Sequence, residues 1–197
     1  LNDFPKQKLF LSRAKICELL TSLNIPCPPH AILYREPDLP PGTSPSTFEE
    51  HDDYIVIDGK KMVKPFLEKP INGDDHNIYV YYHSSEGGGS RRLFRKVGDQ
   101  ASSFYPDISK VRRDASYVYE SFVKCKSNQR DIKVYTIGKD YAHAESRVAP
   151  TLGEKVKRTG QGREKRYAVR LTAEEHTYAS QIVRATGQNI CGIDMLR

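Results

Sequence analysis

Residues 77–97 read Asn-Ile-Tyr-Val-Tyr-Tyr-His-Ser-Ser-Glu-Gly-Gly-Gly-Ser-Arg-Arg-Leu-Phe-Arg-Lys-Val. Two runs rich in aromatic and aliphatic residues, 77–82 and 92–97, flank a glycine-rich segment, which is typical of two β-strands joined by a turn. The same pattern recurs where Asp58-Gly59 and Gly138-Lys139-Asp140 separate runs of strand-forming residues. Since hairpins join antiparallel neighbours and strands outnumber helices, the sequence predicts an α+β fold with antiparallel sheets.

Two helices are expected to flank these sheets. One covers residues 12–24, and the other runs from a capping box at Thr172 to Thr186, with Gly187 as its stop. Residues 34–53 are rich in Pro, Ser, Thr and Glu, so we interpret them as a surface loop. The expected strands cover residues 54–57, 60–63, 64–70, 77–82, 92–97, 116–123, 131–137, 141–148 and 189–197.

The composition favours an anionic partner. The 197 residues include 31 Lys and Arg and carry a formal net charge of +6, which suits nucleic acid, a membrane surface or a phosphorylated small molecule. No apolar run is long enough to cross a bilayer, and we expect no signal peptide. The four cysteines stand singly without zinc-like spacing, so we expect reduced thiols in a cytosolic or nuclear protein, with a cytoplasmic location favoured.

Three features could bind a nucleotide. The glycines at 87–89 can bring backbone N–H groups close to a phosphate, although a flexible turn is the alternative, and no Walker loop is present. Lys69 and His76 suit contacts with an ATP phosphate. The alternative is that Lys69 is an ordinary exposed lysine and His76 an ordinary histidine in a turn. The strand ending at residues 120–123 offers an apolar slot and backbone groups for adenine, or is simply buried.

The hairpin at 131–148 could bind anions on one face. On its second strand Glu145 and Arg147 point the same way. A three-residue loop at 138–140 would place Lys133 opposite Glu145 and diagonal to Arg147. A two-residue loop would turn Lys133 and Arg147 to opposite faces. The alternative to an anion site is a solvated charged face.

Asp194 is the candidate metal ligand. It lies in the apolar run Ile190-Cys191-Gly192-Ile193-Asp194-Met195-Leu196. An unpaired carboxylate in such a strand costs free energy, which a magnesium ion would offset. A hydrogen-bonded structural Asp is the alternative.

Taken in order, several runs resemble the diphosphoinositol pentakisphosphate kinase family. The similarity covers most of residues 64–197 and extends more weakly over 9–36. The runs are Leu67-Glu68-Lys69-Pro70, Gly73-Asp74-Asp75-His76-Asn77-Ile78-Tyr79-Val80-Tyr81-Tyr82, Gly87-Gly88-Gly89-Ser90, Leu93-Phe94-Arg95-Lys96, Val111-Arg112-Arg113-Asp114, Asp131-Ile132-Lys133-Val134-Tyr135-Thr136, Asp140-Tyr141-Ala142-His143-Ala144-Glu145-Ser146-Arg147 and Cys191-Gly192-Ile193-Asp194-Met195-Leu196-Arg197.

The resemblance implies an ATP-grasp fold with ATP between two lobes. It implies a kinase that transfers the γ-phosphate of ATP to a phosphate of inositol hexakisphosphate or diphosphoinositol pentakisphosphate, giving inositol pyrophosphates. ATP and magnesium would be the cofactors and an inositol polyphosphate the partner, with no nucleic acid, no membrane span and a monomeric domain. Residues 1–63, 64–123 and 124–197 would form an N-terminal region and two lobes.

Site residues follow from the same resemblance. The metal ligand would be Asp194, and catalytic groups near the transferred phosphate would be Arg95, Lys133 and Arg147. The substrate clamp would be Arg95, Lys96, Lys133, Arg147 and Arg166. ATP contacts would be Arg13, Lys69, His76, Arg95, Lys133, the adenine edge Glu120-Ser121-Phe122-Val123, and Asp131 near the ribose.

Three departures from the family stand out. Ala149 replaces a Ser that contacts nucleotide, the chain stops at Arg197 before an Asp-x-Asn metal motif, and an N-terminal Lys pair has no counterpart. We therefore expect an incomplete kinase domain.

Because the acceptor oxygen is already anionic, no general base is needed, and catalysis would rest on charge neutralisation and alignment. The basic cluster Arg158, Arg163, Lys165 and Arg166 agrees with that requirement.

Other functions stay open from the residues alone. A basic module could stack single-stranded nucleic acid on tyrosines at 79, 81, 82, 117 and 119, although these alternate with apolar residues as core strands do. An ATP-grasp carboxylate ligase is a second alternative. A fragment that binds nucleotide or substrate without turnover is a third.

Overall fold

The computed structural model describes residues 1–97, 100–123, 130–148 and 166–197. At residues 94–97, 100, 101, 130, 147 and 148 the description covers the backbone alone. The chain forms two compact units. Unit 1 comprises Leu1–Leu9, Ser22–Ile25 and Val123–Arg197, and unit 2 comprises Phe10–Thr21 and Pro26–Phe122. The expected boundaries at residues 63 and 123 stay a prediction.

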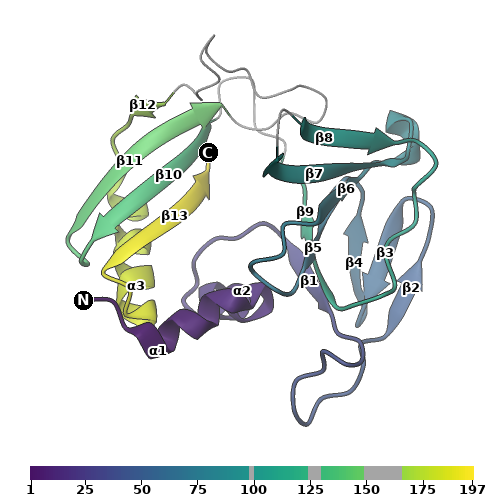
Figure 1. The fold of residues 1–197 in the computed structure, drawn as a ribbon, viewed down its shortest axis with the longest axis horizontal. Helices are drawn as coiled ribbons and strands as arrows, with labels where there is room; N and C mark the ends of the chain where they lie inside the picture. Colours follow the sequence, from purple (N-terminus) through teal and green to yellow (C-terminus); the bar gives the residue numbers. More distant parts are fainter. Residues whose placement is uncertain (98–99, 124–129, 149–165) are drawn as a thin grey trace. The chain divides into compact units, whose positions relative to one another are not determined.

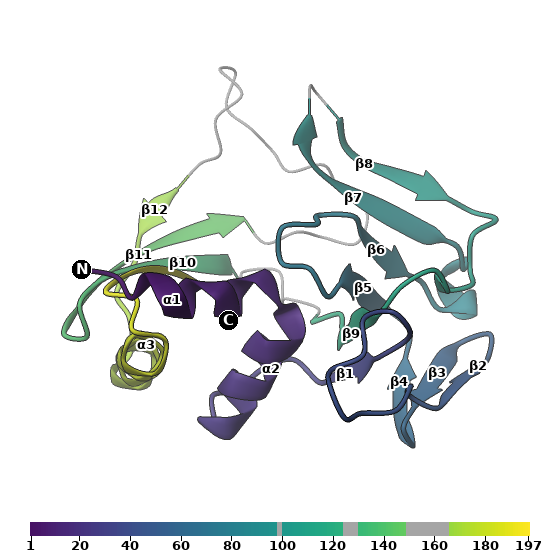
Figure 2. The same cartoon turned by 60° about the horizontal axis from the view of Figure 1, so that its bottom comes forward.

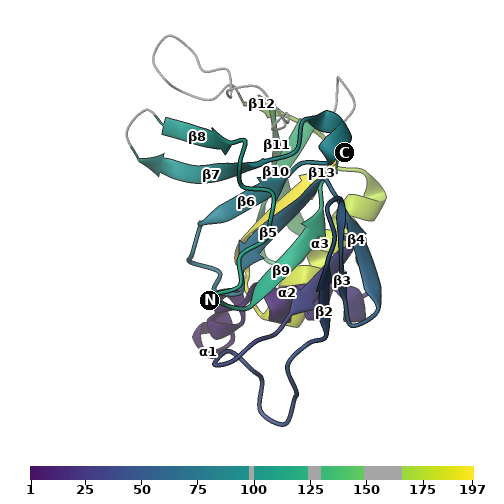
Figure 3. The same ribbon diagram turned by 90° about the vertical axis from the view of Figure 1, so that its right-hand side faces the viewer.

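Unit 2 is built on two antiparallel sheets (Figure 1). The larger sheet has the order β1-β9-β5-β6-β7-β8, and the smaller has the order β2-β3-β4 and packs against β1 and β9 (Figure 3). Helix α2 (Arg13–Ser22), apart from its last residue, and the short 3-10 turn η2 (Ser84–Glu86) belong to the same unit. The strands are β1 His30–Leu33, β2 Phe48–Glu50, β3 Tyr54–Ile57, β4 Lys60–Val63, β5 Phe66–Pro70, β6 Ile78–Tyr81, β7 Ser90–Val97, β8 Gln100–Tyr105 and β9 Tyr117–Ser121.

The core of unit 2 forms because alternate residues of a strand point to the same face. In β5, Phe66 and Glu68 are fully buried, whereas Lys69 lies on the opposite face and is partly exposed. Phe66 packs edge-on against Tyr119, with 5.5 Å between ring centroids. The alternation therefore places Lys69 away from this core, whose other members are Ala31, Leu33, Ile55, Ile57, Met62, Tyr81, Val111 and Tyr117.

Unit 1 is a four-stranded antiparallel sheet with helix α3 (Ala173–Thr186) on one face (Figure 2). The strand order is β12-β11-β10-β13, with β10 Arg130–Ile137, β11 Tyr141–Val148, β12 Tyr167–Ala168 and β13 Ile190–Leu196. The short helix α1 (Phe4–Gln7) leads into the 3-10 turn η1 (Lys8–Leu11). A capping box at Thr172 starts α3, and Gly187 in the left-handed conformation ends it, as predicted.

The three predicted hairpins are confirmed. Asp58 and Gly59 both have positive φ, 49° and 78°, as a tight turn between twisted strands requires. The surface loop expected at 34–53 was wrong in part, because β2 pairs there with β3. The short strands β1, β8 and β12 were also missed, since a few residues carry too little periodicity to be told from a loop.

Candidate active site

Lys69 on β5 is held by Glu120 on the neighbouring strand β9. The distance between Lys69 Nζ and Glu120 Oε1 is 2.8 Å, and 21% of each side chain is exposed. Glu120 lies opposite Leu67, so its carboxylate reaches Lys69 diagonally along one face of the sheet. An ammonium group has three protons, so Lys69 keeps donors for a second acceptor such as a phosphate. The structure thus brings together two residues that the sequence assigned to ATP.

Arg13, at the start of α2, is engaged by backbone carbonyls. Its Nη1 donates to Pro70 O at 2.7 Å and to Asn72 O, and its Nη2 donates to Gly73 O at 3.0 Å. Burial lowers the pKa of Arg13, while Asp75 and Asp74 oppose that shift. Arg13 therefore fixes residues 70–73. An ATP contact would have to use its remaining N–H groups.

His76 lies in a tight turn just after that segment. Its Nδ1 is 2.8 Å from Asp74 O, and Asn77 N donates to Asp75 Oδ1 at 2.8 Å. A carbonyl can only accept, so Nδ1 carries the proton and Nε2 is left for a ligand. The ring is exposed, which suits the expected contact with a nucleotide.

The expected adenine edge has only part of its backbone available. Ser121 N donates to Pro29 O at 2.8 Å, and Phe122 N donates to Pro65 O at 3.1 Å. Within the described part of the chain, the N–H of Val123 has no acceptor. A base at this edge would therefore find its donor at Val123, and its acceptors among the carbonyls.

The glycine-rich segment is a closed turn. The N–H groups of residues 87–89 donate in order to Ser84 O at 3.0 Å, His83 O at 3.1 Å and Ser109 Oγ at 3.0 Å. All three glycines have positive φ, 94°, 63° and 75°, which costs glycine nothing. A phosphate would have to displace an internal acceptor from each N–H. The turn itself explains the three glycines.

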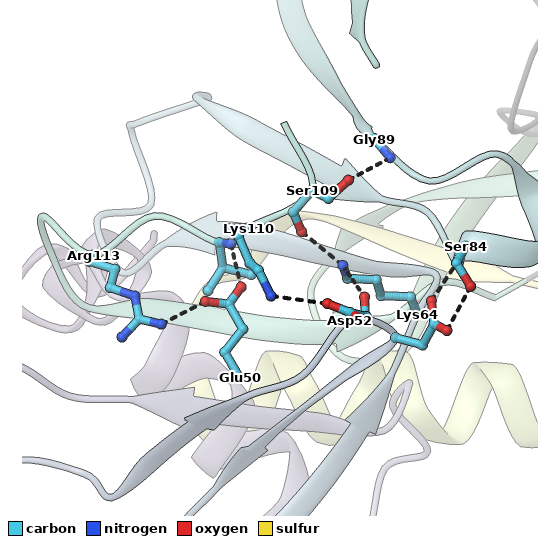
Figure 4. A network of polar contacts seen from close by, with 10 residues as sticks. Glu50, Asp52, Lys64, Ser84, Gly89, Ser109, Lys110 and Arg113 are labelled. Atoms are coloured by element: carbon cyan, nitrogen blue, oxygen red, sulfur yellow. Dashed lines mark hydrogen bonds and ion pairs between the residues drawn. The ribbon is translucent and has the colours of Figure 1, made fainter. Parts of the chain in front are cut away.

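A buried lysine anchors this turn (Figure 4). Lys64 is almost fully buried, and its Nζ donates to Asp52 O and Ser109 O, both at 2.8 Å. Burial lowers the pKa of Lys64. Ser84 donates from N and Oγ to Asp53 at 2.6 and 2.7 Å. These bonds fix the start of β7, the strand that carries two of the expected clamp residues.

The face of the unit 1 sheet opposite α3 carries a row of alternating charges. Lys133 on β10 lies opposite Glu145 on β11 and Asp194 on β13, which confirms the register predicted from a three-residue loop. Lys133 Nζ is 3.0 Å from Asp194 Oδ1, and Arg166 Nη1 is 3.3 Å from Glu145 Oε2. We call Lys133, Glu145, Asp194 and Arg166 the charged row. Two residues further along β11, the backbone of Arg147 pairs with that of Asp131.

Asp194 is not the unpaired buried carboxylate that the sequence suggested. It is 63% exposed and paired with Lys133, because exposed positions alternate along β13. Gly192 leaves room for this pair, since a Cβ there would lie 3.2 Å from Lys133 Cε. No three His, Cys, Asp or Glu residues gather as a metal site in the described ranges. Magnesium often binds one or two carboxylates and the substrate phosphates, so Asp194 fits a site completed by ATP.

For the remaining clamp residues the structure gives mainly the strand or segment on which each one lies. Arg95 and Lys96 lie on β7 and Arg147 on β11, and their side chains fall outside the described part. Arg166 also lies 3.3 Å from Tyr135 OH. Ala149, Arg158, Arg163 and Lys165 fall outside the described residues.

Sequence reasoning assigned no separate role to the buried pair Glu68 and Arg112. Arg112 Nε is 2.5 Å from Glu68 Oε1, and Glu68 is fully buried. Tyr119 and Tyr81 also donate to this carboxylate, at 2.9 and 3.2 Å. Desolvation raises the pKa of Glu68 in spite of Arg112. The only signal for Arg112 was its place in the run at 111–114.

The stacking platform needed by a nucleic-acid binder is absent among the tyrosines proposed for it. Tyr81, Tyr82, Tyr117 and Tyr119 are buried, and Tyr79 is partly buried. These rings fill or border the core of unit 2. In the described ranges, no helix is long and apolar enough to span a membrane.

Comparison with known proteins identifies relatives over the whole chain. No protein-family model matches. The chain is 40% identical over 214 residues to the inositol hexakisphosphate and diphosphoinositol-pentakisphosphate kinase of Saccharomyces cerevisiae. It is 43% identical over 197 residues to the corresponding kinase of Arabidopsis thaliana and to kinase 2 of Homo sapiens. Each match covers 100% of this chain.

The chain is homologous to a segment of the inositol hexakisphosphate and diphosphoinositol-pentakisphosphate kinases. It spans only 19%, 18% and 15% of the length of these three relatives. The resemblance seen in the sequence is thereby confirmed.

The fold prediction is confirmed by solved structures. Two structures of the ATP-grasp ligase PsnB match 99% and 98% of this chain, with TM-scores of 0.50 and 0.52 and identities of 13% and 14%. Each match covers 48% of the ligase chain, and one of the structures holds a minimal precursor, Mg and ADP. At such low identity the likeness concerns the fold alone.

Proposed function

We propose that this chain binds ATP and transfers its γ-phosphate to a phosphate of inositol hexakisphosphate or diphosphoinositol pentakisphosphate. The observation that carries the proposal is identity of 40–43% over the whole chain to kinases named for these two substrates. The charged row of unit 1 and the Lys69 site of unit 2 supply chemistry that suits the reaction.

Each unit has a role in this proposal. In unit 2, Lys69 donates to a phosphate of ATP while Glu120 holds its ammonium group, and His76 offers Nε2 nearby in the sequence. In unit 1, Lys133 on β10 and Arg147 on the paired strand β11 neutralise the phosphates that react. Arg is suited to grip two phosphate oxygens at once, as a substrate crowded with phosphates requires.

The acceptor is itself a phosphate oxygen that is already ionised near neutral pH, so no general base is needed to remove a proton from it. The barrier is mainly repulsion between two polyanions and their alignment. Lys133 is already oriented by Asp194 at 3.0 Å, which reduces the reorganisation needed when a phosphate arrives. When bound, magnesium would add positive charge beside Asp194 and the ATP phosphates.

The test is to incubate the chain with γ-labelled ATP and inositol hexakisphosphate. We expect the label in a product more acidic than the acceptor. Lys69→Ala should abolish ATP binding without unfolding unit 2, because Lys69 lies off the core, and the matched control Lys61→Ala should bind ATP as the parent does.

Two outcomes would contradict the proposal in different ways. Retained ATP affinity in Lys69→Ala refutes the role of that residue. Binding of ATP and inositol hexakisphosphate without label transfer would favour the alternative of a fragment that cannot turn over.

A further inference from the structure

Arg112 connects two segments of unit 2 that carry proposed ATP contacts. Its Nη2 donates to Asn77 O at 2.7 Å, and Asn77 directly follows His76 in the chain. Its Nε and its backbone N–H donate to the two carboxylate oxygens of Glu68, at 2.5 and 3.0 Å. Glu68 directly precedes Lys69 on β5. One residue thereby ties the turn of His76 to the strand of Lys69.

The turn that carries His76 depends on bonds from other elements. Its internal hydrogen bonds join only residues two or three apart, so they close the turn without fixing it to the sheet. Before His76, Arg13 donates to the carbonyls of residues 72 and 73. After His76, in the described part of the chain, Arg112 supplies the one hydrogen bond that reaches residues 74–77 from another element. His76 thus lies between two arginine anchors.

The guanidinium of Arg112 is itself held by its surroundings. It lies 4.7 Å from the centroid of the Tyr79 ring and 4.5 Å from that of the Tyr117 ring. Its side chain is only 19% exposed. Two rings and two acceptors leave this planar group one orientation, so Asn77 O meets a donor of fixed position. A lysine has a single nitrogen and no planar face, and it would follow the carboxylate of Glu68, the stronger acceptor.

We infer that Arg112 is a positioning residue for ATP, because it fixes the turn that presents His76 to the nucleotide. The inference rests on the kinase function proposed above. The ring of His76 is exposed, and its Nδ1 is bonded to Asp74 O at 2.8 Å, so the position of Nε2 follows the backbone of the turn. If the turn were free to move, ATP would have to order it on binding, and that cost would lower the affinity.

A purely structural role accounts for only part of this arrangement. Glu68 is fully buried and needs a counter-charge, which the Nε of Arg112 supplies. The Nη2 group is not used by this carboxylate and goes to the turn instead. The two roles also differ in what they predict. A structural role affects stability alone, whereas a positioning role affects ATP affinity through His76.

The test is a double-mutant cycle on ATP affinity, measured by calorimetry on the whole chain with magnesium present. Arg112→Lys keeps a cation beside Glu68, so the chain should stay folded, and backbone NMR should show shift changes centred on residues 74–78. His76→Ala should weaken ATP binding about tenfold, since it removes one contact to a charged ligand. Arg112→Lys should weaken it about fivefold, the cost of ordering one mobile group. Because Arg112 acts through His76, the double variant should bind ATP no more weakly than His76→Ala alone.

The matched control is Arg113→Lys, which makes the same exchange at the neighbouring position. The side chain of Arg113 is 62% exposed and pairs with Glu50, so ATP affinity should stay within about twofold of the parent value. Tyr79→Leu is a second variant, which removes one ring from the guanidinium and retains Arg112. It should weaken ATP binding about threefold, with no further loss in the His76→Ala background.

Each failure has a distinct signature. Additive losses in the double variant, or unchanged ATP affinity in Arg112→Lys, would overturn the positioning role while the proposed kinase function stands. If Arg112→Lys does not fold, Tyr79→Leu with and without His76→Ala decides the same question. Absence of ATP binding by the parent chain would overturn the proposed function, and this inference with it.

Discussion

Replacing Arg112 by Met should strip a buried carboxylate of its counter-charge. The variant loses the bond from Nε to Glu68 at 2.5 Å and the bond from Nη2 to Asn77 O at 2.7 Å. It also loses the guanidinium that lies 4.7 Å from the Tyr79 ring and 4.5 Å from the Tyr117 ring. Breaking a buried ion pair costs about 3–5 kcal/mol.

The loss should fall near the middle of that range. Glu68 keeps hydrogen bonds from Tyr119, Tyr81 and the backbone N–H of residue 112, which limit the cost of its charge. The two ring contacts add about 0.5–1 kcal/mol each. We therefore expect Arg112→Met to lower the free energy of unfolding by about 4 kcal/mol at neutral pH.

The loss should also depend on pH. Desolvation already raises the pKa of Glu68 above its ordinary value of 4.5, and Arg112 opposes this shift. Without Arg112 the pKa rises further. A carboxyl with a raised folded-state pKa destabilises the fold as pH rises from the unfolded-state pKa to the folded one. The variant should therefore lose less stability at pH 5 than at pH 8.

The assay is urea unfolding followed by tyrosine fluorescence. The chain has 12 Tyr and no Trp, and four tyrosines surround the pair. The control is Lys110→Met, which breaks an exposed ion pair with Asp52 and should cost no more than about 1 kcal/mol. A loss below about 1 kcal/mol for Arg112→Met, or an equal loss at both pH values, would refute the reasoning.

Two further predictions concern the glycine turn and the substrate. Gly89→Ala should lower the free energy of unfolding by about 2–4 kcal/mol. The left-handed backbone conformation costs alanine about 1–2 kcal/mol. The rest of the loss comes from steric overlap, because the new Cβ would lie 2.8 Å from Tyr105 O. Gly87 also has positive φ, but no atom lies within 4 Å of a Cβ added there, so Gly87→Ala should lose only the stability that left-handed strain costs. Thermal melts of the two variants compare these losses, and equal losses of stability would contradict the packing argument. Arg147→Ala should weaken binding of inositol hexakisphosphate more than binding of ATP in calorimetry; equal weakening would argue against its place in the substrate clamp.

The sequence by itself determined the hairpins, the last helix and the family resemblance. Two-residue periodicity, turn residues such as Asp58-Gly59 and the capping box at Thr172 are local signals, so they survive without tertiary contacts. The sequence left the loop at 138–140 open between two and three residues, and the structure has the pairing of Lys133 with Glu145 that the longer loop implies. The family resemblance came from the same source, and identities of 40–43% over the whole chain to the named kinases confirm it.

Tertiary structure alone decided what each charged residue contacts. Strands distant in sequence bring Glu120 to Lys69, and Arg112 to Glu68. The glycines at 87–89 looked open to phosphate until the hydroxyl of Ser109 and backbone carbonyls were found to accept their N–H groups. Burial and partners are properties of neighbours in space, and a linear pattern contains no information on which side chain desolvates or pairs with another.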